Sequence, residues 1–168
     1  APVTVKAFKG IPYAHPPVGE RRWRAPIPLE RLPRDPFQAW AYGPAAPHQP
    51  TTGERIALSA KTAKSEPGPG ASAPAAESED CLFLNVWTPA GAPTDRLPVL
   101  VWIHGGGFVR GTASTPGTDG TRLAARGVVV VTLNYRTGPL GFFHHEAFAN
   151  EADSKVNFGL LDQIMALR

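Results

Sequence analysis

Three consecutive glycines, Gly105 to Gly107, stand between His104 and Phe108 and follow directly on a run of apolar residues. Glycines at the end of a strand often mark a site where backbone N–H groups face a bound anion, and several such sites have sequence patterns. A dinucleotide site has the pattern Gly-x-Gly-x-x-Gly, but Arg110 occupies the position of the last glycine. A phosphate-binding loop ends in Gly-Lys-Ser or Gly-Lys-Thr, and the sequence contains neither.

An oxyanion hole is the third kind of site, and its His-Gly-Gly-Gly pattern matches the sequence. When an ester carbonyl is attacked, its oxygen becomes an anion, and N–H groups that already point at it stabilise the transition state. Loss of one such donor typically costs about 3–4 kcal/mol. Glycine suits this role because no side chain stands in the way. The pattern therefore predicts an oxyanion loop, and a tight turn without chemical function is the alternative.

The segments around the glycines must position them. Val99–Ile103 is a continuous apolar run, which is typical of a strand covered on both faces in a parallel sheet. A helical pattern follows over 120–126 and ends at Gly127, and 128–133 reads as a second buried strand. Strand, helix and strand in this order predict a parallel unit and an α/β fold.

Other segments predict further elements. Residues 3–8 and 82–87 read as strands, and the polar stretch 48–79 reads as a long surface loop. Asn157 is typical of a helix N-cap. The apolar stripe of that helix consists of Leu160, Ile164 and Leu167, with Leu161 and Met165 beside them.

A serine nucleophile of this chemistry lies in Gly-x-Ser-x-Gly, at a turn between a strand and a helix. None of the six serines has that pattern: Ser72 lacks the second glycine, and Ser114 lacks both. No set of serine, acid and histidine in the required order follows. The adjacent pair His144 and His145, next to Glu146, is a weak metal motif because neighbouring side chains point in different directions. We expect neither a metal nor a cofactor.

Composition limits the partners. A formal net charge of +3 in 168 residues is too small to indicate nucleic acid by itself. The basic stretch 21–24 is interpreted as solvated arginines with internal ion pairs rather than a phosphate grip. One cysteine excludes an internal disulfide, and no run approaches the roughly 20 apolar residues of a membrane span. A small-molecule ester is the partner that the glycine loop predicts.

Five segments in order resemble the type-B carboxylesterases, the family of carboxylesterases, cholinesterases and related lipases. They are Ala7–Ala14 with Pro16–Gly19 and Arg22-Trp23; Ser78–Trp87, in which Phe83 stands where tyrosine is common; His104–Phe108; Asn134–Arg136 with Gly138 and Gly141-Phe142; and Asn157–Gln163. The resemblance covers nearly the whole chain. It implies that residues 1–168 form the N-terminal part of a single α/β-hydrolase domain.

The resemblance also implies roles for individual residues. Gly106 and Gly107 supply two oxyanion donors, while Gly105 and Phe108 shape the loop and a nearby acyl pocket. His104 is a packed structural histidine and not the catalytic base. Two ion pairs of the scaffold join distant segments, Arg22 with Glu79 and Arg136 with Asp162.

Two departures from the family bear on function. Many members pair the cysteine of the second segment with an upstream cysteine, but Ala46 stands near that position. We therefore expect Cys81 to be a buried free thiol and the loop 48–79 not to be pinned at its base. A free thiol favours a reducing compartment, although the localisation stays open. The loop also contains no tryptophan, which argues against a specialised choline esterase.

The missing nucleophile is explained most simply by truncation. In the family, the serine follows shortly after the helix that begins at Asn157, and the chain stops at Arg168 while that helix is still running. The hypothesis is a serine esterase that works through an acyl-enzyme and takes its oxyanion loop from this chain. The alternative is a non-catalytic adhesion or binding protein of the same fold. Either way, Val99–Ile103 would lie at an exposed apolar edge of the sheet.

Overall fold

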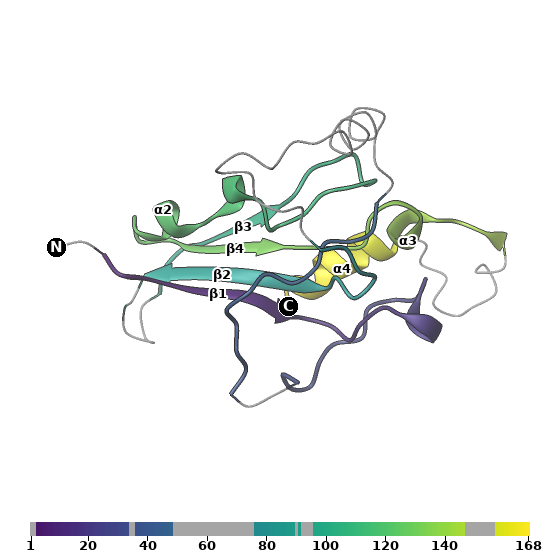
Figure 1. Ribbon diagram of the computed structural model, residues 1–168, viewed down its shortest axis with the longest axis horizontal. Helices are drawn as coiled ribbons and strands as arrows, with labels where there is room; N and C mark the ends of the chain where they lie inside the picture. Colours follow the sequence, from purple (N-terminus) through teal and green to yellow (C-terminus); the bar gives the residue numbers. More distant parts are fainter. Residues whose placement is uncertain (1–2, 34–35, 49–75, 90, 92–95, 147–156) are drawn as a thin grey trace, which may run out of the picture.

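A four-stranded mixed sheet runs through the computed structural model, which describes residues 3–33, 36–48, 76–89, 91, 96–146 and 157–168. The spatial order is β1 (Val5–Pro12), β2 (Phe83–Pro89), β4 (Val129–Leu133) and β3 (Val99–Ile103). β1 pairs with β2 and β2 with β4 in antiparallel fashion, whereas β3 and β4 are parallel. Figure 1 shows the four strands side by side, with β2 running against its neighbours. The predicted parallel pair is confirmed.

The crossover between β3 and β4 contains the short 3₁₀ helix η2 (Pro116–Thr118) and the helix α2 (Thr121–Ala124). α2 is shorter than the predicted 120–126. Ala124 packs with Trp87 of β2 and Val130 of β4 in one of the hydrophobic clusters. This contact holds the crossover against the sheet.

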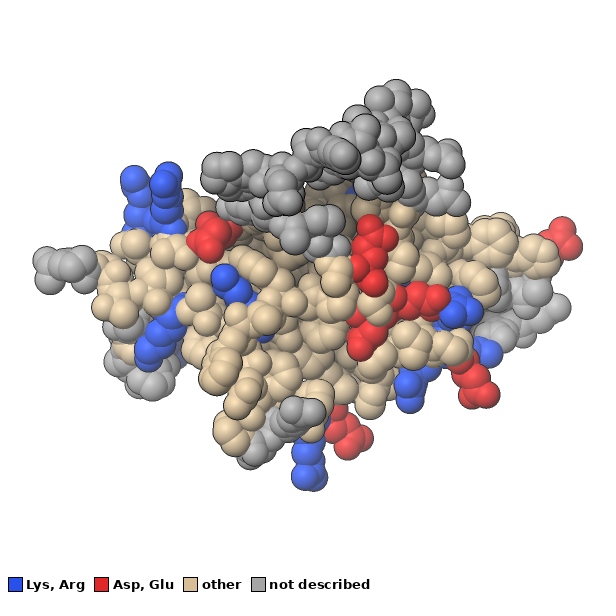
Figure 2. All heavy atoms as spheres, in the orientation of Figure 1, with Lys and Arg blue, Asp and Glu red and all other residues tan. Residues whose placement is uncertain are grey.

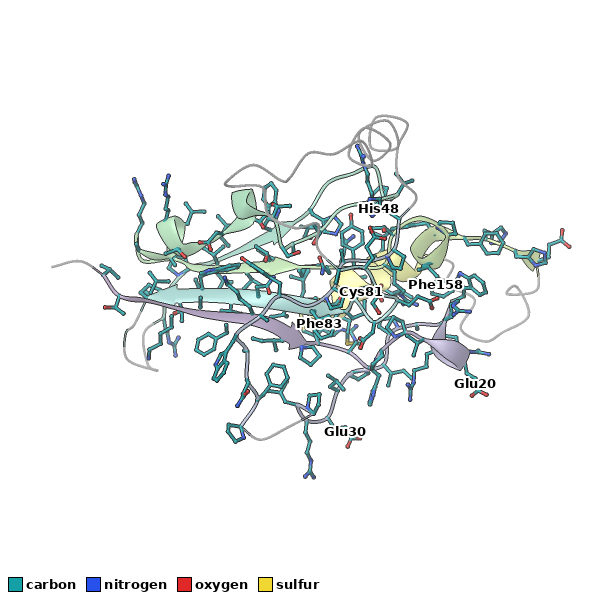
Figure 3. The ribbon with its side chains drawn as sticks, viewed as in Figure 1. Glu20, Glu30, His48, Cys81, Phe83 and Phe158 are labelled. Carbon is teal, nitrogen blue, oxygen red and sulfur yellow. The ribbon has the colours of Figure 1, made fainter. Side chains whose placement is uncertain are left out.

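A second cluster lies at the opposite end of the sheet and contains Cys81 and Ala46, which are both fully buried. Met165 of α4 packs against this cluster, and Cys81 and that helix overlap in the view of Figure 3. Burial raises the pKa of the Cys81 thiol to about 12. The structure therefore confirms a buried free thiol.

The base of the predicted loop 48–79 is better fixed than expected. Most of the loop, 49–75, lies outside the described residues, but its ends do not. The N–H of Ala45 donates to the carbonyl of Ala76 at 2.8 Å, and the N–H of Ser78 donates to the carbonyl of Ala45 at 3.0 Å. The expectation of an unpinned base is therefore wrong, because these backbone hydrogen bonds join the two ends of the loop.

Two helices follow β4, the short α3 (Gly138–Phe142) and α4 (Phe158–Ala166), and they pack against each other. Both lie at the end of the sheet to which β4 points (Figure 1). Asn157 stands at the N-cap position of α4, but its side chain caps no N–H; its carbonyl accepts from Leu160 and Leu161 instead. The predicted N-cap position is confirmed, although the Asn157 side chain makes no capping hydrogen bond.

The buried face of α4 is not the apolar stripe. Its buried residues are Phe158, Gly159 and Asp162, whereas the stripe is exposed at Leu160, Ile164 and Leu167. The reason is an ion pair: Asp162 turns inward to meet Arg136, which places the stripe on the opposite side of the helix. Periodicity predicted the helix correctly and its buried side incorrectly.

β3 is the sheet's edge strand within the described part of the chain, and all five of its residues are exposed. Val99 is 61% and Trp102 49% exposed. The expectation that this strand is covered on both faces is therefore wrong in this structure, while the expectation of an exposed apolar edge is confirmed. A strand with one pairing partner leaves a row of backbone groups open on its other side.

Candidate active site

The glycine loop runs from His104, at the end of β3, to Ala113, and its backbone is left-handed at three consecutive residues. The φ angles are +125° at Gly106, +62° at Gly107 and +63° at Phe108. A Cβ at Gly106 would also overlap the carbonyl oxygen of Arg110, so glycine is required there for two reasons. Gly107 has open space around it, and only its φ angle favours glycine.

Phe108 is the unexpected member of this turn, because a bulky residue rarely has a positive φ angle. Such conformations cost of order 1–3 kcal/mol and cluster at ligand-binding and active sites. Here the carbonyl of Phe108 is held by the N–H of Gly138 at 2.6 Å, and the Phe108 ring lies 4.9 Å from that of Phe142. These contacts with α3 hold the residue in its strained conformation.

The N–H groups of Gly106 and Gly107 donate to no acceptor among the described residues, and both residues are exposed. The neighbouring N–H of Val109 closes the turn by donating to the carbonyl of Gly106 at 3.2 Å. Two adjacent, unused donors in a left-handed turn resemble the backbone concavities that bind anions. The loop can therefore accept an anionic oxygen.

At its start the loop is anchored by His104, which is buried. The His104 ring stacks on that of Tyr135 with a centroid distance of 4.3 Å, and the Tyr135 hydroxyl donates to the His104 carbonyl at 3.0 Å. Burial lowers the pKa of His104, an effect only partly offset by its hydrogen bond to Gly105. The prediction of a packed, hydrogen-bonded histidine is confirmed.

At its end the loop is anchored by Ala113, which is fully buried. The Ala113 N–H donates to Asn134 Oδ1 at 2.7 Å, and the amide of Asn134 donates in turn to the carbonyl of Pro44 at 2.8 Å. Asn85 lies at the same end of the loop. Its amide donates to Thr132 Oγ1 at 2.9 Å, and its Oδ1 accepts from the Gly10 N–H. The sequence indicated Asn85 and Asn134 only as members of the family's motifs. Neither motif shows that these side chains support the glycine loop.

An open apolar pocket of about 430 Å³ adjoins the loop. None of the described residues that line it is charged: they are Gly107, Phe108, Val109, Gly138, Pro139, Phe142 and Phe143. Gly105, which was expected to shape such a pocket together with Phe108, does not line it. The pocket can take an uncharged group attached to a carbonyl that is held at Gly107.

The basic stretch 21–24 lies close to this pocket. Trp23 Nε1 donates to the carbonyl of Pro139 at 2.9 Å, and the Trp23 ring lies 5.9 Å from that of Phe143. Arg22 forms the expected pair with Glu79, at 2.7 and 2.8 Å. Figure 2 shows basic and acidic side chains interspersed on the face in view.

The second expected ion pair, Arg136 with Asp162, is also present and is almost fully buried. Asp162 Oδ2 accepts from Arg136 Nε at 2.8 Å and from the Arg136 backbone N–H at 3.1 Å, while Oδ1 accepts from Nη2 at 2.7 Å. The guanidinium also lies 5.3 Å from the ring of Phe158. This pair fixes the middle of α4 to the segment that follows β4.

The remaining candidate residues do not join the site. Ser72 lies outside the described residues, and Ser114 Oγ lies 2.7 Å from Thr112 Oγ1 in a local turn. His144, His145 and Glu146 are exposed, and the His145 ring stacks on Phe143. In the part of the chain that the structure describes, no group of three or more His, Cys, Asp or Glu residues could hold a metal ion. No helix of that part is long and apolar enough to cross a membrane.

Known proteins share this sequence and this arrangement. The family model "Carboxylesterase family" matches residues 1–168. A para-nitrobenzyl esterase of Bacillus subtilis (strain 168) is 48% identical over 98% of this chain, and a cholinesterase of Mus musculus is 42% identical over 98%. A solved thermophilic PNB esterase is 44% identical over 97% of this chain, with a TM-score of 0.74. The chain spans 30% of the first relative, 25% of the second and 30% of the solved structure.

Proposed function

Since the chain belongs to the carboxylesterase family, we propose that it is the N-terminal part of a serine esterase and supplies the oxyanion loop of that enzyme. The observation that carries this proposal is the left-handed turn at Gly106, Gly107 and Phe108, which leaves two adjacent N–H groups without an acceptor in the described part of the chain. A turn that served only to reverse the chain would not need to hold a phenylalanine in a strained conformation. The α/β-hydrolase fold agrees with the solved relatives.

The chemistry follows from these two donors. A serine hydroxyl attacks the ester carbonyl carbon, a histidine base takes the serine proton, and the carbonyl oxygen becomes an anion. The N–H groups of Gly106 and Gly107 donate to that oxygen. As the tetrahedral intermediate collapses, the C–O bond to the alcohol breaks, the base returns the proton to the alcohol, and an acyl-enzyme remains. Water then releases the acid by the same route.

The nucleophile and its base lie outside the 168 residues in this proposal, because no Gly-x-Ser-x-Gly occurs in them. The pocket of about 430 Å³ beside Gly107 supports an uncharged ester as the substrate, since the described residues that line it carry no charge. The proposed substrate class is therefore a neutral carboxylic ester.

The test compares two polypeptides on p-nitrophenyl acetate. The polypeptide encoded by the complete reading frame should hydrolyse the ester with a burst of p-nitrophenol, as an acyl-enzyme requires. The 168-residue chain should show no burst, and a burst from that chain would refute the placement of the nucleophile. If the reading frame encodes no Gly-x-Ser-x-Gly after Arg168, the esterase proposal fails and a non-catalytic binding protein of the same fold takes its place.

A further inference from the structure

The structure assigns His104 a specific positioning role, in which its Nδ1–H group sets the orientation of the Gly105–Gly106 peptide and thereby aims the Gly106 N–H at the oxyanion. The inference rests on the proposed function only in taking that N–H as an oxyanion donor. The orientation itself depends on contacts within this chain. His104 is thus a positioning residue, since it acts through the backbone and does not touch the substrate.

The tautomer of His104 follows from its surroundings. Nδ1 lies 3.0 Å from the carbonyl oxygen of Gly105, which can only accept a hydrogen bond. If the proton were on Nε2, the Nδ1 lone pair would face that oxygen and repel it. Nε2 is buried and has no hydrogen-bond partner among the described residues, so nothing there favours a proton on it. The proton of the neutral ring therefore lies on Nδ1.

Peptide geometry carries the effect to the next residue. In a trans peptide, the C=O and the N–H lie in one plane and point in opposite directions. The Gly105 carbonyl points toward the buried His104 ring, so the Gly106 N–H points away from that ring. Gly105 and Gly106 are both exposed, whereas His104 is buried, which places this N–H on the open side of the loop. Glycine is free enough to let this peptide flip if the histidine did not hold it.

Two further contacts keep the ring in place. Tyr135 holds the ring by stacking and the His104 carbonyl by a hydrogen bond, so both parts of the residue are fixed. Gly111 also lies against the His104 ring and leaves room for its Nδ1. A Cβ at position 111 would overlap both His104 Nδ1 and the Gly105 carbonyl. The backbone approaches the ring closely at that point, which accounts for glycine there.

The first experiment observes the tautomer directly. The chain is labelled with ¹⁵N-histidine, and long-range ¹H–¹⁵N correlation spectra are recorded at neutral pH. The His104→Asn chain identifies the signals of His104 among those of the five histidines. The expected pattern is that of a neutral ring protonated on Nδ1. A ring protonated on Nε2 would overturn the inference, whatever the catalytic activity of the protein.

The second experiment measures catalysis by the complete polypeptide with two substitutions. Asparagine places its amide nitrogen at the position of Nδ1, whereas the longer glutamine side chain places its amide at the position of Nε2. His104→Asn should keep kcat within about tenfold of the unsubstituted protein. His104→Gln should lower kcat by about 10²–10³-fold, the usual effect of losing one oxyanion donor, with KM nearly unchanged.

Thermal melting of both variants separates orientation from folding. Equal losses of kcat in two folded variants would overturn the inference, because the donor position would then not matter. If the unsubstituted complete polypeptide does not hydrolyse esters at all, the proposed function fails. The tautomer spectrum still decides, in that case, whether His104 holds the Gly105–Gly106 peptide.

Discussion

The two bidentate ion pairs of this chain have the same chemistry and differ in burial, which makes them a matched test of what burial does to a salt bridge. Arg136 and Asp162 are 2% and 0% exposed at their side chains, whereas Arg22 and Glu79 are 39% and 29% exposed. The shortest N···O distance is 2.7 Å in both pairs. The length of the side-chain hydrogen bonds therefore does not distinguish the two pairs.

Asp162→Asn leaves the Arg136 guanidinium charged and buried, since arginine does not lose its proton in proteins. Removal of one partner from a buried pair costs about 3–5 kcal/mol. The substitution also affects a hydrogen bond from the Arg136 backbone N–H, so three contacts are weakened together. Against a total stability of about 5–15 kcal/mol, the expected loss is a large part of the whole.

The assay is urea denaturation followed by tryptophan fluorescence. With a slope of about 1–3 kcal/mol/M, the loss should lower the midpoint by about 1 M or more in Asp162→Asn. Glu79→Gln should leave the midpoint close to that of the unsubstituted chain, because water screens the exposed pair. The double variant Arg136→Met/Asp162→Leu should recover much of the loss, since it leaves no buried charge unpaired.

Equal shifts of the midpoint in Asp162→Asn and Glu79→Gln would refute the reasoning. So would a double variant that is less stable than Asp162→Asn, because the unpaired charge would then not be the cause. In that case the contacts of Arg136 with the backbone and with the Phe158 ring would have to account for the destabilisation.

Three further predictions concern the loop, the thiol and the sheet edge. Gly106→Ala should lower kcat of the complete polypeptide by about 10²–10³-fold, because the added Cβ overlaps the Arg110 carbonyl and displaces a donor. Gly117→Ala is the control, because a Cβ there would have only Thr115 Oγ1 within 4 Å, at 3.9 Å. Cys81 should resist alkylation at pH 8 until the chain is unfolded, since it is buried and its raised pKa lowers the thiolate fraction. The same shift means that its contribution to stability is complete below pH 9 and is lost as the pH rises through about 12. Val101→Lys should reduce self-association of the chain in sedimentation velocity, because a charge on an exposed edge strand opposes strand pairing. Because it should self-associate less, the same variant can be used for the ¹H–¹⁵N correlation spectra of His104.

Each of these predictions has an outcome that contradicts it. Equal activity of Gly106→Ala and Gly117→Ala would exclude the proposed donor role of Gly106. Rapid alkylation of the folded chain would show that the Cys81 thiol is accessible. Unchanged self-association in Val101→Lys would place the contact between copies somewhere other than β3.

Local pattern was enough to predict the main elements, and it also predicted an oxyanion role for the loop, which stays a proposal. The apolar runs 99–103 and 128–133 with the helix between them predicted a parallel pair. The pattern of apolar residues within one segment depends on the backbone of that segment alone, so it can be interpreted without the tertiary structure. The glycines after the first run predicted an anion-binding turn for the same reason. The two ion pairs were predicted by family resemblance, and not by spacing, because their members lie far apart in the chain.

Burial and orientation were decided by the tertiary structure, because they depend on which segments meet. α4 turns Asp162 inward rather than its leucines, since Arg136 lies under it and a buried charge needs a partner. β3 is exposed because only β4 pairs with it among the described residues. The left-handed conformation of Phe108 and the orientation of the Gly105–Gly106 peptide depend on Gly138, Tyr135 and Gly111, which no local pattern connects to the loop. The sequence alone thus determined which residues form the loop, and only packing against distant segments decided where its N–H groups point.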